Sequence, residues 1–247
     1  MSPARALPNK PAGPVEQGPV GFVMDVLVGL VLGSLFSWAI GVIIEVAGGY
    51  TNVAWPDHAV EHARALVQED LDFTSEYPRS IVIADTVAFE QDVARIAAWP
   101  FEHLGLVRFY ESSQAPVPET VTGIKRAILL ARVELGKAAA IGMYVAMDVA
   151  MRLWVIVFAL PAFALACLLG TVDGLVRRDL RRWGGGRESS FVYHRAKKAA
   201  TWSLTGGFGL YLAWPIGGFN PAYMVLVFTA LVAASLSVTV SSFKKYV

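Results

Sequence analysis

The sequence is poor in charge and in cysteine, and both shortages limit the kinds of protein it can encode. Only 17% of the 247 residues are charged and the mean hydropathy is +0.50, whereas soluble domains contain about 25% charged residues. Cys167 is the only cysteine, so the chain forms no internal disulfide and packing must hold any external domain together. The composition excludes a disulfide-stabilised secreted domain and indicates an integral membrane protein.

Three long runs contain no Lys, Arg, Asp or Glu at all. They cover residues 26–44, 153–172 and 199–243. About 20 apolar residues of helix cross the hydrocarbon core of a bilayer, so the first two runs each predict one crossing. The third run predicts two, because prolines and glycines between residues 214 and 221 break it near the middle. We therefore expect an all-α, polytopic protein with four transmembrane helices.

The charged residues between these runs predict the orientation. Residues 46–151 contain 8 basic and 14 acidic residues, whereas residues 173–198 contain 8 basic and 3 acidic residues. Because basic loops stay in the cytoplasm, we expect both termini and the basic loop inside and the acidic segment outside. The expected order is a disordered tail (1–20), a first transmembrane helix (21–47), a small, mainly helical external domain (48–149), a second transmembrane helix (150–172), a basic loop (173–198), a transmembrane helical hairpin (199–243) and a short tail (244–247).

The external segment shows helical patterning. A helix is predicted from Trp55-Pro56-Asp57 onward, because apolar residues recur there at helical spacing (Val60, Ala63, Leu66, Val67 and Leu71). A second apolar stretch runs from Ile81 to Trp99, where Pro100 is expected to interrupt it, and its first three residues also suit a strand. Pro116 and Pro118 mark another break. From about Glu119 a long helix is expected to enter the second crossing, with Asp148 and Arg152 at a spacing that suits an ion pair.

Small residues recur every four positions in the predicted crossings. The first crossing contains Gly29, Gly33, Ser37 and Gly41, and similar stripes are Ala162, Ala166 and Gly170 in the second crossing and Ala233, Ser237 and Ser241 in the last. Such stripes allow two helices to approach closely. They predict helix packing, either within this chain or with a helix of a partner, which includes a second copy of the chain.

The basic loop carries the densest charge in the sequence. Its predicted contact residues are Arg177, Arg178, Arg181, Arg182, Trp183 and Arg187. Arginines at this position attract anionic lipid at about 1 kcal/mol each, and they also suit the docking of a cytoplasmic protein. One short loop supplies few phosphate contacts, so we predict no direct nucleic-acid binding.

Catalytic and transport chemistry find little support in the sequence. His58, Glu61 and His62 match the H-x-x-E-H order of a zinc peptidase, but five residues match easily by chance and the third ligand would have to be Glu134 or His103. No nucleophile, base and oxyanion hole can be assembled. The predicted crossings contain no deep ionisable residue, and Asp25, Glu45 and Asp173 are expected at their edges. We expect no enzyme, cofactor or metal site; a zinc peptidase and a small exporter or channel are the alternatives.

Two stretches carry a family resemblance. Asp173–Arg182 and Gly186–Lys198, together with the hydropathy layout from Gly21 to Val247, resemble the integrating conjugative element membrane proteins. The resemblance implies a bacterial inner-membrane component of conjugative DNA transfer through a type IV secretion-like apparatus, with the acidic domain in the periplasm. It also implies other membrane components of that machinery, and the coupling ATPase, as partners. It supplies no catalytic residue, so a scaffold or assembly role is the expectation.

Overall fold

The computed structural model describes residues 19–51, 59–76, 83–184 and 220–242, with short pieces between residues 194 and 217. Throughout these ranges the regular structure is helical, and none of it is a strand. The expectation of an all-α chain is therefore confirmed for them. The chain divides into two compact units, Met1–Gly33 and Ser34–Val247, and the contacts described below lie within the second unit.

Three described helices are long and apolar enough to cross a membrane. They are α1 (Pro19–Thr51), α5 (Gly123–Trp183) and α7 (Pro221–Ser241). They correspond to the first, second and fourth predicted crossings, and Asn220 caps α7 by accepting a hydrogen bond from the Ala222 N–H at 2.8 Å. Several predictions fall largely or wholly outside the described residues, namely the tail before residue 19, the helix start at 55–57, residues 81 and 82, Arg187, the first arm of the hairpin and the tail after residue 243.

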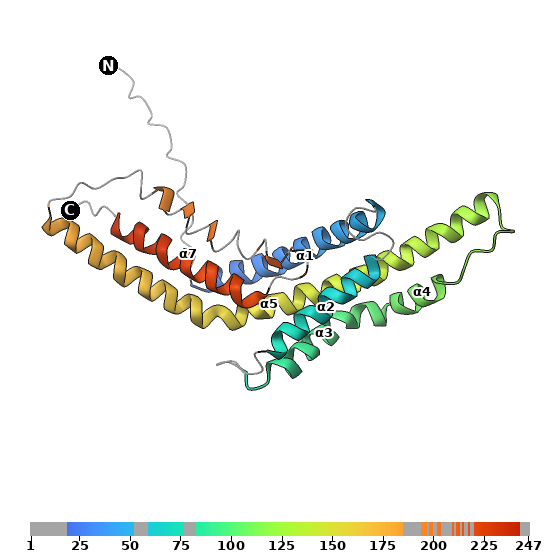
Figure 1. Ribbon diagram of the computed structural model, residues 1–247, viewed down its shortest axis with the longest axis horizontal. Coiled ribbons are helices and arrows are strands. Elements are labelled where there is room, and N and C mark those ends of the chain that lie inside the picture. Colours follow the sequence, from blue (N-terminus) through green and yellow to red (C-terminus); the bar gives the residue numbers. More distant parts are fainter. Residues whose placement is uncertain are drawn as a thin grey trace, which may run out of the picture. The chain divides into compact units, whose positions relative to one another are not determined.

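Helix α7 lies alongside the C-terminal half of α5 (Figure 1). The small-residue stripes of the two helices face each other, because a Cβ on Gly170 would collide with the Ala233 backbone and one on Gly174 would lie 2.7 Å from the Ser237 carbonyl oxygen. Phe163 and Val232 are buried beside this contact. Gly170 in the α5 stripe and Ala233 and Ser237 in the α7 stripe thus serve packing within the chain.

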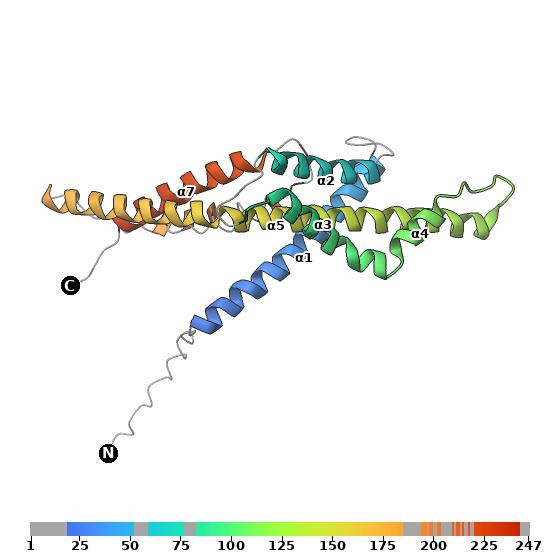
Figure 2. The ribbon, with the colours of Figure 1, turned by 90° about the horizontal axis from the view of Figure 1, so that it is seen from below.

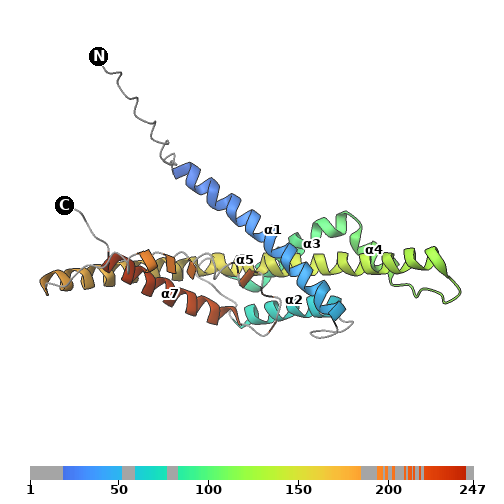
Figure 3. The ribbon, with the colours of Figure 1, turned by 90° about the horizontal axis from the view of Figure 1, so that it is seen from above.

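Helices α2 (Ala59–Ser75), α3 (Thr86–His103) and α4 (Leu106–Ser113) pack against the N-terminal half of α5 (Figure 2). The predicted face of α2 is confirmed, since Ala63, Leu66 and Val67 are buried. Val67 joins Val93, Ala94 and Met151 in one apolar core. Gly105, with a φ of 74°, allows the tight turn from α3 to α4. The part of α1 that follows Gly33 crosses α5 (Figure 3), where the Trp38 indole N–H donates to the Gly142 carbonyl at 2.8 Å.

Two boundaries differ from the predictions. Pro100 does not interrupt α3, which continues to His103: the proline removes one N–H from the helix, and its carbonyl still accepts a hydrogen bond from the Leu104 N–H at 3.0 Å. The segment expected as a loop from residue 173 is helical as far as Trp183. Its Arg and Leu residues favour helix, and the helix ends where the run of three glycines that starts at Gly184 begins.

Candidate functional site

A buried arginine on α5 joins three parts of the fold. The Arg152 guanidinium contacts Asp148 on the same helix at 2.9 Å and donates through Nε to Asp70 on α2 at 3.1 Å. Its Nη1 also donates to the backbone carbonyls of Tyr211 and Trp214, in the segment before α7. Only 5% of the Arg152 side chain is exposed. The Asp148–Arg152 pair predicted from the four-residue spacing is therefore confirmed, and its partners are more numerous than predicted.

A second buried pair lies close to this arginine. Glu45 on α1 and His62 on α2 meet at 3.0 Å between Oε2 and Nδ1, and Glu45 is 1% exposed. Glu45 and Asp148 line the same small cavity. Glu45, expected at the edge of the first crossing, has its partner within the protein, because its side chain is buried against His62. We refer to Glu45, His62, Asp70, Asp148 and Arg152 as the polar cluster.

The polar cluster connects α1, α2, α5 and the segment before α7. Its three carboxylates face one guanidinium and one imidazole, so the acidic groups outnumber the basic ones whether or not His62 is protonated. Charges buried in this way must be paired and hydrogen-bonded to be tolerated. The cluster therefore holds α1, α2, α5 and the segment before α7 in one fixed arrangement.

The predicted zinc ligands are not brought together in the described part of the chain. His58 lies outside it, and His62 is paired with Glu45. Glu134 instead accepts a hydrogen bond from the Tyr50 hydroxyl at 2.6 Å and contacts Lys137, and His103 stacks on Trp99. Among the described residues, no three His, Cys, Asp or Glu side chains are grouped to hold a metal ion.

The basic residues are at the C-terminal end of α5, beside the end of α7. Arg177 pairs with Asp173 at 2.8 Å, and Asp173 also accepts a hydrogen bond from Ser237 on α7. Arg181 donates to the Ser241 carbonyl at 3.3 Å. Arg182 and Trp183 extend outward, and Trp183 is 92% exposed. We call residues 177–183 the basic end. Its exposed arginines and its indole do not pack into a hydrophobic core.

The stripe in the first crossing is divided between the two units. Ser37 and Gly41 are buried, and a Cβ on Gly41 would lie 2.7 Å from Val145 Cγ1. Gly41 therefore packs α1 against α5, and Ser37 is buried one turn before it. Gly29 and Gly33 are on the same helix within the first unit.

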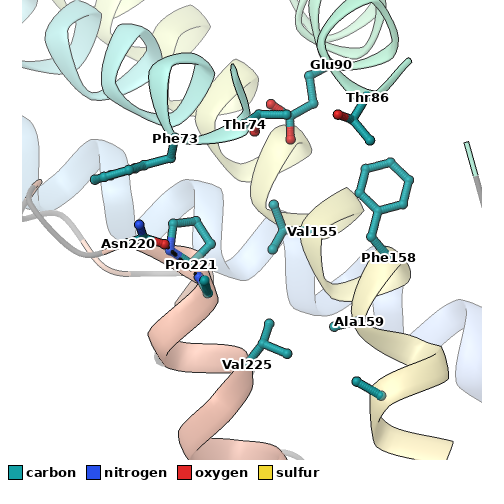
Figure 4. A pocket seen from close by; sticks show the side chains of 12 residues that line it. Phe73, Thr74, Thr86, Glu90, Val155, Phe158, Ala159, Asn220, Pro221 and Val225 are labelled. Carbon is teal, nitrogen blue, oxygen red and sulfur yellow. Dashed lines mark hydrogen bonds between the residues drawn. The ribbon is translucent and has the colours of Figure 1, made fainter. Parts of the chain in front are cut away.

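Another buried carboxylate, outside the polar cluster, is that of Glu90 on α3, which is 1% exposed. Burial raises the pKa of Glu90 from 4.5 to about 7; Thr74 opposes this rise, and the charge of Asp70 adds to it. Glu90 lines a pocket between α2, α3, α5 and α7, in which its carboxylate points toward Thr74 (Figure 4). An acid with a pKa near neutrality can hold or release a proton under physiological conditions.

This pKa predicts how stability depends on pH. An unfolded glutamate loses its proton near pH 4.5, whereas folded Glu90 keeps its proton until about pH 7. The unfolded state therefore binds fewer protons between these values, and the stability contribution falls as the pH rises, by about 2 kcal/mol from pH 5 to pH 7. Glu90→Gln should remove this part of the pH dependence in denaturation curves of the detergent-solubilised protein. Glu102→Gln, an exposed position on the same helix, should leave it intact; identical pH profiles for wild type and Glu90→Gln would refute the assignment.

Sequence reasoning missed Glu45, His62 and Asp70 as partners of the predicted ion pair, and it missed Glu90. Asp70 and Arg152 are 82 positions apart, and Glu45 and His62 are 17 apart on different helices. No local spacing indicates such contacts. For Asp70 the sequence contains a weak signal, because it lies four residues after Leu66 and therefore on the predicted apolar face of α2. In the structure its side chain is 13% exposed.

Comparison with known proteins identifies a family. Residues 54–244 match the family model described as IncC plasmid conjugative DNA transfer protein DtrJ-like. The match covers most of the chain, including the polar cluster after Glu45 and the whole basic end. No curated protein and no solved structure matches the chain.

Proposed function

This chain belongs to the DtrJ-like family of conjugative DNA transfer proteins, and from that membership we propose that it is a non-enzymatic scaffold of the transfer machinery in the bacterial inner membrane. The observation that carries the proposal is the basic end. It presents arginines and an exposed tryptophan at the end of a helix long and apolar enough to cross a membrane. Such a surface suits a docking role at the cytoplasmic face, because arginine and tryptophan dominate contact sites between proteins.

The proposal includes a topology. Four crossings, with the first hairpin arm as the third crossing, place both termini and the basic end in the cytoplasm and α2, α3 and α4 in the periplasm. This arrangement is supported by the acidic charge of residues 46–151 and the basic charge of residues 173–198. The coupling ATPase of a type IV secretion-like apparatus, encoded on an integrating conjugative element or a plasmid, is the proposed cytoplasmic partner.

Deletion of the gene tests the role in transfer. We expect the deletion to lower the transfer frequency of the conjugative element strongly and expression of the chain in trans to restore it. Donor growth should be unchanged. Normal transfer from the deletion strain would reject the proposed function.

A matched pair of variants tests the docking role. Arg177, Arg178 and Arg182 are changed to glutamine together, and Arg181 is kept because it bonds to the end of α7. Losing three cations near an anionic surface or an acidic partner removes about 3 kcal/mol of attraction, so transfer should fall at least about tenfold. The control changes three other exposed cations to glutamine, Lys125 and Arg126 at the opposite end of α5 and Arg108 on α4, and should transfer normally. Equal transfer by the two variants, at equal membrane levels, would reject docking at the basic end.

A further inference from the structure

The pocket that contains Glu90 has a volume of about 390 Å³, within the range of about 300–1,000 Å³ of small-molecule sites. It lies between the ends of α2 and α3, the middle of α5 and the first turn of α7 (Figure 4). No part of the polar cluster lines it. Its walls are formed by Phe73, Thr74, Thr86, Glu90, Val155, Phe158, Ala159, Ala162, Asn220, Pro221, Ala222 and Val225.

The pocket is apolar at one end and polar at the other. Val155, Phe158 and Ala162 belong to the charge-free run 153–172 of α5, and Val225 belongs to that of α7. At the other end, α2 and α3 contribute Thr74, Thr86 and Glu90 (Figure 4). Such a gradient suits an amphipathic molecule with an alkyl chain and a polar head.

The polar end favours a cation that donates hydrogen bonds. Glu90 is 1% exposed, and its Oε2 has no hydrogen-bond partner among the described residues. A buried carboxylate oxygen without a partner is costly, so a donor that enters the pocket is stabilised there. Asp70 adds negative charge near Glu90, which disfavours an anionic head. A protonated amine supplies both the positive charge and the N–H groups that Oε2 lacks.

The opposite wall suits a phosphate. Asn220 uses its side-chain oxygen to cap α7 by accepting from the Ala222 N–H at 2.8 Å, which leaves its amide NH₂ as a donor. It stands at the N-terminus of a 21-residue helix, where the helix dipole favours negative charge. In Figure 4, Asn220 and Pro221 lie on the side of the pocket across from Phe158 and below Glu90.

We propose that this pocket binds a phospholipid with a primary amine in its headgroup, with an alkyl chain between α5 and α7 and the ammonium group at Glu90. The lipid is the favoured source of this chemistry because the apolar wall is built from two helices long and apolar enough to span the bilayer. The site is independent of the proposed scaffold role. It gives the protein a selective lipid contact at the level of the first turn of α7.

The test is lipid retention by the full chain. The protein is placed in nanodiscs of equimolar phosphatidylethanolamine, phosphatidylglycerol and phosphatidylcholine, and the protein with its retained lipids is then released and its mass measured by native mass spectrometry. We expect one retained phosphatidylethanolamine, favoured about tenfold over phosphatidylglycerol, because a charge-assisted hydrogen bond is gained only by the amine. Phosphatidylcholine, whose methylated ammonium donates no N–H bond, should be retained less. Equal retention of all three lipids would overturn the proposal.

Two variants test the contact with the lipid headgroup and the contact with the alkyl chain separately. Glu90→Gln should abolish the preference for the amine, whereas Glu102→Gln, exposed on the same helix, should keep it. Ala162→Phe fills the apolar end from an exposed position and should reduce retention of every lipid without disturbing Glu90. Retention of phosphatidylethanolamine by Glu90→Gln at the wild-type ratio, or by Ala162→Phe at the wild-type level, would place the lipid elsewhere and overturn the site.

Discussion

Replacing Arg152 with methionine is expected to destabilise the folded protein by about 3–5 kcal/mol, as removal of one partner from a buried ion pair generally does. Methionine fills much of the same volume, so the loss is electrostatic. Asp70 and Asp148 would then face each other without a cation, and the carbonyls of Tyr211 and Trp214 would lose a shared donor. The segment before α7 should detach first, because this arginine is its polar attachment to α5.

Chemical denaturation in detergent measures this loss, and proteolysis of the intact protein locates it. Arg95→Met is the control, because Arg95 pairs with Asp92 at 3.0 Å but is 75% exposed, and such surface pairs contribute at most about 1 kcal/mol. Changing Asp148 to asparagine together with Arg152→Met should recover part of the stability, since one unpaired charge is removed. A cost below about 1 kcal/mol for Arg152→Met would show that the polar cluster does not hold the helices together.

Replacing Gly170 with valine should separate α7 from α5 and cost about 3 kcal/mol, the upper part of the usual range for overpacking. A Cβ at this position already collides with the Ala233 backbone, and backbone cannot rotate away as a side chain can. The two extra methyl groups of valine make the overlap worse. Gly174 faces the Ser237 carbonyl one turn further along, so the displacement would spread along the contact.

Gly184→Val, at the residue that caps the C-terminal end of the same helix, is the matched control. A Cβ there would meet the Leu180 carbonyl oxygen at an ordinary 3.5 Å, and the φ of Gly184 is −84°, which valine adopts without strain. Its effect should stay within about 0.5 kcal/mol, as for most surface changes. Thermal unfolding of both variants in the same detergent provides the measurement. A Gly170 variant as stable as the control would mean that α5 and α7 do not need close contact.

Much of the helical framework could be predicted from local pattern. Charge-free length identified α1, α5 and α7, and the spacing of Ala63, Leu66 and Val67 identified the buried face of α2. The Asp148–Arg152 pair followed from one helical turn of separation. In each case the decisive information lies within about 20 consecutive residues, the range over which helix geometry relates sequence to position.

The polar cluster depends on contacts between residues that lie on different helices. Glu45 was expected at a membrane edge because it ends a charge-free run, yet its burial depends on His62, which the sequence separates by 17 residues. Glu90 reads as an ordinary helix-surface acid among Phe89 and Gln91, and only the packing of α2, α5 and α7 makes it an isolated carboxylate in a pocket. Pairing between helices depends on their tertiary arrangement, which periodicity within one helix does not contain.

Helix α5 runs without a break for 61 residues, which corresponds to a rod of about 90 Å, while the hydrocarbon core of a bilayer is about 30 Å thick. Helix α5 alone therefore contains the surface that contacts α2, α3 and α4, the surface that packs against α7, and the basic end. Pro161 is the proline inside it, and it is the position where the backbone ladder lacks an N–H. Apart from that position, backbone hydrogen bonding connects the portion that contacts α2, α3 and α4 to the arginines, with no intervening loop. A tilt of one end of this helix therefore also moves the other end, and Pro161 is where it bends most readily.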